Sequence, residues 1–173
     1  MDTKAIKNAI EVELSDTQGF LAVDPVALEH LVRRVFAHEG VECASISLAL
    51  VDNATIHAIN RRHLDHDWPT DVITFPLSDP DDPILAGELV VSTEMAVVTA
   101  QRAGLDPWAE LALYVVHGLL HLCGYDDHSA EDRATIRSRE DAILAGEGLT
   151  NTFPLVGFAE TEGPGRESTR WPL

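Results

Sequence analysis

The stretch HGLLHLCGYDDH places three histidines, His117, His121 and His128, close together in the chain. His117 and His121 are four residues apart, so on a helix they lie one turn apart on the same face. Three neutral imidazoles with an open fourth position are a common arrangement for catalytic zinc, which lowers the pKa of bound water to about 7. The spacing therefore predicts a metal site. The alternative is a buried helix whose histidines each bond a carbonyl or hydroxyl group.

The neighbours of these histidines indicate which metal chemistry to expect. In HExxH metalloproteases the glutamate after the first histidine is the general base, and here that position is Gly118. A protease of that mechanism is therefore disfavoured, whereas metal-activated water could still attack a phosphodiester. Asp126 and Asp127 can orient a ligand or a bound water, or else cap the backbone of the turn. Cys123 follows His121 by two residues on the same helix and is expected to point away as a core cysteine.

The histidine pair must be positioned by a helix whose two ends are both marked in the sequence. Asp106 followed by Pro107 is a cap-plus-proline start signal, and residues 111–122 are apolar nearly all round. This pattern predicts a central, buried helix over residues 107–122. Gly124 is suited to end the helix in the left-handed conformation, after which the turn can fold back and bring His128 to the pair.

The rest of the chain predicts an α+β fold. Apolar residues alternate with polar ones in AIEVEL, as in a strand with one buried face, and Asp24 with Pro25 opens a helix that ends at Gly40. A capping box at Ser129 and Asp132 opens the last helix. The expected strands lie near residues 5–14, 45–51, 71–77 and 87–92, and the expected helices near 25–40, 53–62 with Asp52 or Asn53 as cap, 93–104, 107–122 and 130–146. This order, βαβαββααα, predicts a single domain with a four-stranded mixed sheet and about five helices.

Length and composition suit one such domain. The chain has 173 residues, enough to bury a core without disulfides or a structural metal. We expect residues 1–150 to form a metallohydrolase domain and the polar segment 151–173, rich in glycine and proline, to be a flexible tail. No apolar run approaches the roughly 20 residues of a membrane span, and there is no signal-peptide pattern. Cys43 and Cys123 form no disulfide framework, so a cytoplasmic protein that does not bind membranes is expected.

Net charge argues against nucleic acid as a partner at first sight. The chain carries 29 acidic and 12 basic residues, for a net charge of −17, which repels polyanions. Binding of RNA would require basic residues to gather around a cleft while the acidic ones face elsewhere. The basic residues considered for this are Arg33, Arg34, Arg61 and Arg62.

Three segments carry a resemblance to a known family. HGLLHLCGYDDH resembles the signature HGxLHLxGYDH of the YbeY family, bacterial single-strand-specific metallo-endoribonucleases. INRRHLDHDWPTDVITFPL is similar to the family's Asn-Arg stretch, followed by Pro-Thr-Asp-Val and a strand ending in Phe-Pro. GELVVSTE is similar to its strand Gly-Asp-Ile-Val-Ile-Ser-x-Glu. The histidine signature is highly specific, whereas the other two segments would be weak alone.

The resemblance implies one zinc ion per chain, held by His117, His121 and His128. It also implies cleavage of single-stranded RNA, with roles in forming the 3′ end of 16S rRNA and in ribosome quality control. The implied partners are rRNA, the small ribosomal subunit and ribosome-assembly factors.

The chain departs from the family pattern in the turn that carries the third histidine. The family places five residues between its second and third histidines, whereas an extra aspartate makes it six here. The turn is therefore expected to bulge so that His128 reaches the metal.

A second departure concerns RNA contacts. The family carries an arginine four positions after its Asn, and ungapped alignment from Asn60 puts Leu64 there. Arg61 and Arg62 could substitute as substrate-binding residues, and His63 or His66 could line the same cleft, or these could be ordinary surface residues. The catalytic acid and base remain unassigned.

Two other functions fit the same residues. One is a ribosome-assembly factor that works by binding, with a structural metal that fastens the turn to the helix. The other is metal-dependent hydrolysis of a peptide or small molecule.

Overall fold

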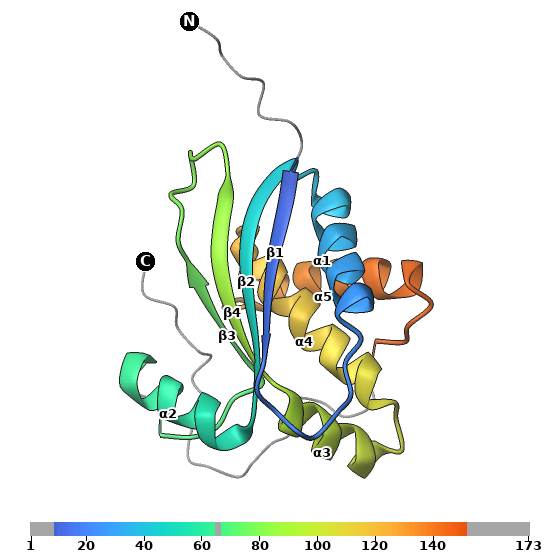
Figure 1. Cartoon of the computed structure of the whole chain (residues 1–173). Helices are drawn as coiled ribbons and strands as arrows, with labels where there is room; N and C mark the ends of the chain where they lie inside the picture. Colours follow the sequence, from blue (N-terminus) through green and yellow to red (C-terminus); the bar gives the residue numbers. More distant parts are fainter. Residues whose placement is uncertain (1–8, 65–66, 152–173) are drawn as a thin grey trace, which may run out of the picture.

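Four strands form one mixed sheet (Figure 1). They are β1 (Ala9–Asp16), β2 (Cys43–Val51), β3 (Val72–Pro76) and β4 (Leu85–Ser92), in the order β1-β2-β4-β3. β1 pairs with β2 and β2 with β4 in parallel, whereas β3 runs antiparallel to β4 at the edge. The structure is a computed structural model, and it describes residues 9–64 and 67–151. The start of the strand expected at residues 5–14 lies outside this range.

Five helices connect and cover the strands. They are α1 (Pro25–Glu39), α2 (Asn53–Leu64), α3 (Thr93–Ala103), α4 (Pro107–Leu122) and α5 (Ala130–Gly146). The caps are those that the sequence predicts: Asp24 and Asp106 accept hydrogen bonds from backbone N–H groups in the first turns of α1 and α4. For α2 the capping side chain is Asp52, whose Oδ1 accepts from the N–H of Thr55 at 2.7 Å.

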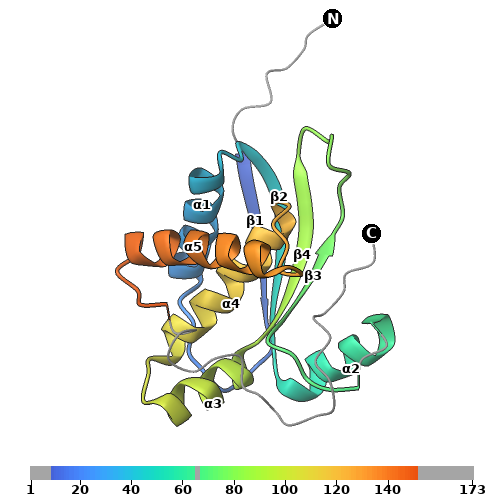
Figure 2. The same ribbon diagram turned by 180° about the vertical axis from the view of Figure 1, so that it is seen from behind.

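The main core lies between one face of the sheet and the helices α1 and α4. α4 is buried at every position from Ala109 to Leu120, which confirms it as the central helix. α5 packs across α4 and α1, so that α4 is enclosed between α5 and the strands β3 and β4 (Figure 2). This arrangement brings a second helix over the histidine pair.

A smaller core lies on the opposite face of the sheet, under α2. Val72 and Val91 belong to the main core, whereas Ile73 and Val90 pack with Ile56 of α2. Because neighbouring residues of a strand point to opposite faces, α2 covers the face that α4 does not. Residues on α2 and residues on α4 are therefore separated by the sheet.

Gly118 lets α4 approach the sheet closely. A Cβ atom added there would lie 2.8 Å from Cδ2 of Leu89 and 3.0 Å from Cγ2 of Val72, closer than carbon atoms pack. On the same side Thr74 Oγ1 donates to the Gly118 carbonyl at 3.4 Å. The glycine that stands where HExxH proteases have their base is thus required for packing, and no glutamate fits there.

The predicted α+β fold and the order βαβαββααα are confirmed. Of the predicted tail at 151–173, all but Asn151 lies outside the described residues. Within residues 9–64 and 67–151, no helix combines the length and apolar character that crossing a bilayer requires.

Candidate metal centre

His117 and His121 form the centre of the site, near the C-terminal end of α4. Their Nε2 atoms face each other at 3.0 Å, and the two rings are nearly perpendicular, with an interplanar angle of 87°. Helical spacing of four residues places both side chains on one face, as the sequence predicts. Two imidazole nitrogens therefore converge on one point.

The other nitrogen of His117 is held by a buried carboxylate. Nδ1 lies 2.7 Å from Oε1 of Glu140 on α5, and Glu140 is fully buried. The second carboxylate oxygen accepts from Nη1 of Arg137, so the buried charge is paired. Metal-binding histidines generally donate their second N–H to a carboxylate or carbonyl group in this way.

The other nitrogen of His121 is held by the backbone of the turn after α4. Nδ1 lies 2.9 Å from the carbonyl oxygen of Tyr125. Gly124 adopts a φ of 96°, which turns the chain back over the helix end as predicted, and the N–H of Tyr125 donates to the Leu120 carbonyl at 3.1 Å. The Tyr125 hydroxyl donates to Glu39 of α1 at 2.8 Å and anchors the turn.

These contacts fix the tautomers of both rings. A carboxylate and a backbone carbonyl can only accept hydrogen bonds, so the proton of each neutral ring sits on Nδ1. Both Nε2 atoms then carry lone pairs directed at each other, which suits a shared cation. Burial lowers the pKa of His121, and the charge of a protonated His117 lowers it further, whereas Asp127 raises it. Burial thus disfavours a proton bound between the two Nε2 atoms.

The third group of the cluster is the carboxylate of Asp127. One ligand atom from each of His117, His121 and Asp127 lies within 4.8 Å of the other two. Oδ1 of Asp127 is buried and, within the described part of the chain, accepts no hydrogen bond. Leaving a buried polar atom unpaired costs about 1–3 kcal/mol, and more for a charged group. A divalent cation would satisfy this oxygen and both Nε2 atoms, so these residues fit a metal ion.

The predicted third ligand, His128, lies beside this cluster. Its Nε2 is 3.2 Å from Oδ1 of Asp126, its Nδ1 is 3.9 Å from Oδ1 of Asp127, and its side chain is 40% exposed. His128 forms a second group with Asp126 and Asp127. The turn thus directs the aspartate before His128, and not His128 itself, toward the pair. That His128 binds metal stays a prediction.

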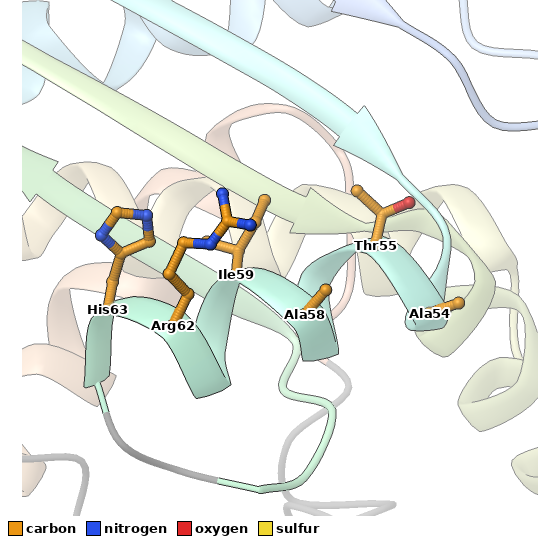
Figure 3. A pocket seen from close by; sticks show the side chains of 6 residues that line it. All are labelled: Ala54, Thr55, Ala58, Ile59, Arg62 and His63. Atoms are coloured by element: carbon orange, nitrogen blue, oxygen red, sulfur yellow. The ribbon is translucent and has the colours of Figure 1, made fainter.

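Arg61 and Arg62 are exposed on α2, on the other side of the sheet from the histidine pair. Arg62 and His63 line a pocket of about 400 Å³, and Figure 3 shows both rising from the same side of the helix. The His63 ring also meets Phe75 of β3 edge-on, with 5.8 Å between ring centroids. The role of both arginines as RNA contacts stays a prediction, and His66 lies outside the described residues.

Cys123 and Glu140 are the remaining residues that bear on the sequence predictions. Cys123 packs against the main core, where burial raises the pKa of its thiol to about 12, in agreement with the predicted core cysteine. Glu140 was not predicted as a site residue. It lies with Ile136, Ile143 and Leu144 on the buried face of α5, and a carboxylate on an apolar face is the signal that could have found it.

The fold and the site together define an α+β protein with a candidate metal centre of two histidines and one aspartate at the end of its central helix. A family model described as Endoribonuclease YbeY matches residues 13–148. The chain belongs to the YbeY endoribonuclease family.

Individual relatives agree with this assignment. The Endoribonuclease YbeY of Rhodopirellula baltica is 43% identical over 141 residues, covering 80% of this chain and 72% of the relative. That of Carboxydothermus hydrogenoformans is 36% identical over 139 residues, covering 79% of this chain and 97% of the relative. The solution structure of TM1509 from Thermotoga maritima has a TM-score of 0.56 and 24% identity, covering 81% of this chain and 92% of that one, and supports the fold alone.

Proposed function

We propose that this protein is a metal-dependent endoribonuclease that cuts single-stranded RNA in rRNA processing. The observation that carries the proposal is the pair of imidazole Nε2 atoms 3.0 Å apart, with the Nδ1 of each ring held by an acceptor. The proposed reaction, cleavage of RNA, comes from the relatives, which are named endoribonucleases. The resemblance of the histidine signature points the same way.

A divalent metal ion at this pair would supply a Lewis acid that activates water and stabilises negative charge on phosphoryl oxygens. The chain's own contribution is to hold the ligands. Glu140 fixes the tautomer and orientation of His117, and the Tyr125 carbonyl orients His121. Imidazole ligands suit zinc, and we propose one zinc ion per chain.

The number of ligand groups favours catalysis over a structural metal. Structural zinc sites are usually closed by four protein ligands, whereas catalytic sites have three and keep one position open. In the described part of the chain, the group around the histidine pair contains three such side chains. This supports an enzyme over an assembly factor that acts by binding alone.

The finer parts of the proposal follow the family resemblance. They are maturation of the 3′ end of 16S rRNA, ribosome quality control, and action in the cytoplasm with the small ribosomal subunit and assembly factors. Arg61 and Arg62 are proposed to contact RNA from α2, where both side chains are exposed.

The test is cleavage of a labelled single-stranded RNA by the zinc-loaded protein and two variants. Replacing His121→Ala removes one ligand and is expected to lower the cleavage rate by at least about 100-fold, beyond the usual effect of losing an outer-shell partner. Replacing His30→Ala changes an exposed histidine of α1 that pairs with Glu147 and belongs to neither group of possible metal ligands among the described residues, and it is expected to leave the rate unchanged. Equal cleavage by wild type and His121→Ala would mean that the activity comes from elsewhere.

A further inference from the structure

We propose that Asp127, and not His128, is the third protein ligand of the metal bound by His117 and His121. The ligand set is then two imidazoles and one carboxylate. The inference rests on the metal site of the proposed function and specifies its composition.

The first support is the placement of ligand atoms. The carboxylate of Asp127 lies within 4.8 Å of ligand atoms of both histidines, and its Oδ1 is buried without a hydrogen bond within the described residues. The imidazole of His128 is 40% exposed, and its Nε2 lies 3.2 Å from Asp126. A carboxylate oxygen of Asp127 is thus within reach of the histidine pair. Oδ1 of Asp127 accepts no hydrogen bond within the described residues, although it lies 3.9 Å from Nδ1 of His128, whereas the nearer partner of the third imidazole is Asp126.

The second support is that the backbone is fixed from Asp127 to the start of α5. Nη1 of Arg133 donates to the carbonyl oxygens of Asp127 and His128, at 3.0 and 2.9 Å. Ser129 begins α5 with a complete capping box. Moving His128 into the place of Asp127 would shift the chain by one residue and break these bonds.

The third support is the residue count. When the signature HGxLHLxGYDH is laid on the chain from His117 without a gap, its final position falls on Asp127. The path through the turn then has the length that the signature has, and no bulge is needed. With this alignment the additional residue is His128 and not an aspartate, and His128 leads directly into the cap of α5.

A carboxylate in this position has a chemical consequence for metal choice. Two histidines and one carboxylate bind zinc in metalloproteases and iron in oxygenases, and a carboxylate suits manganese better than an imidazole does. We therefore expect Asp127→His to lower the affinity for Mn²⁺ relative to Zn²⁺. This readout does not depend on catalysis.

The experiment measures zinc affinity of the full chain by competition with a chromophoric chelator. Asp127→Asn keeps the size of the side chain and removes its charge, and we expect affinity to fall by at least about 100-fold, more than for an outer-shell residue. His128→Gln is the matched variant, and less than about a 10-fold loss is expected, within the lower range of outer-shell changes. A loss in His128→Gln as large as in Asp127→Asn overturns the proposal.

Two controls keep the outcome interpretable. Asp127→His combined with His128→Gln leaves a ligand only at position 127 of the turn, so a folded double variant that binds zinc supports the proposal even if Asp127→Asn unfolds. Failure of the folded double variant to bind zinc contradicts it. RNA cleavage measured on the same samples separates the two claims. If zinc binding depends on Asp127 but no RNA is cleaved, only the proposed function is contradicted. If RNA is cleaved but zinc binding depends on His128, only the assignment of Asp127 as a ligand is contradicted.

Discussion

Glu140 is a fully buried charged residue next to the site. It accepts from His117 at 2.7 Å and pairs with Arg137. A buried carboxylate of this kind is retained only where its charge is matched. Its place behind the imidazole of His117 gives it a function beyond packing, since it sets the tautomer and orientation of that ring.

Replacing Glu140→Gln tests this role. The amide keeps the shape of the side chain but loses the negative charge, so zinc affinity is expected to fall by about 10–100-fold. Isothermal titration with zinc measures the change, and circular dichroism checks the fold. Glu131→Gln is the matched control, because Glu131 is exposed in the first turn of the same helix. Unchanged affinity in folded Glu140→Gln would remove Glu140 from the site.

At this scale the sequence predicted the pair of side chains that helical spacing brings together, and it could not predict the arrangement of groups that depend on tertiary contacts. His117 and His121 follow from a separation of four residues on a helix. The choice between Asp127 and His128 depends on the path of a turn, which Arg133 and the Ser129 cap fix through contacts made elsewhere. Glu140 comes from another helix, and no local pattern relates it to His117.

The helix α4 carries the histidine pair, and at Gly118 it packs directly against the sheet. Gly118 allows this approach, with Leu89 and Val72 directly beneath it. The ends of α4 were predictable, because Asp106 and Gly124 act locally. How closely α4 packs against the sheet could not be predicted, because it depends on which strands lie under the helix.

Replacing Gly118→Ala should destabilise the fold. Overpacking costs about 1–3 kcal/mol, and the better helix propensity of alanine returns up to about 1 kcal/mol. A net loss near 1–2 kcal/mol corresponds to a fall in Tm of roughly 2–8 °C for a chain of this size. Thermal denaturation followed by circular dichroism measures it.

Gly146→Ala is the matched control for this change. It lies at the end of α5, where an added Cβ would meet only the guanidinium group of Arg34 at 3.1 Å. That side chain is half exposed and can move aside. We expect no loss of stability, and equal Tm values for Gly118→Ala and wild type would contradict the packing explanation.

On the scale of the whole molecule, the order of elements could be predicted and their arrangement could not. The strands and helices follow from local periodicity and caps. The insertion of β4 between β2 and β3 depends on long-range pairing, such as Leu48 with Leu89 and Ile73 with Val90. This arrangement separates α2 from the histidine pair, so the position of Arg61 and Arg62 relative to the site could not be predicted from the sequence.

The net charge of −17 means that the molecule as a whole repels a polyanion such as RNA. Any attraction for RNA must therefore come from local positive charge at the binding site. A bound divalent cation adds positive charge at the point where a phosphate must approach. The metal would thus serve both binding and chemistry, and its removal should abolish both.

The most direct measurement is single-turnover cleavage of single-stranded RNA by metal-stripped protein during stepwise addition of zinc. The expected result is a rate that rises from background in proportion to added zinc and levels off at about one equivalent per chain, as for a single catalytic site. Cleavage by the stripped protein at the full rate, or no cleavage after one equivalent is bound, would contradict a metal-dependent endoribonuclease.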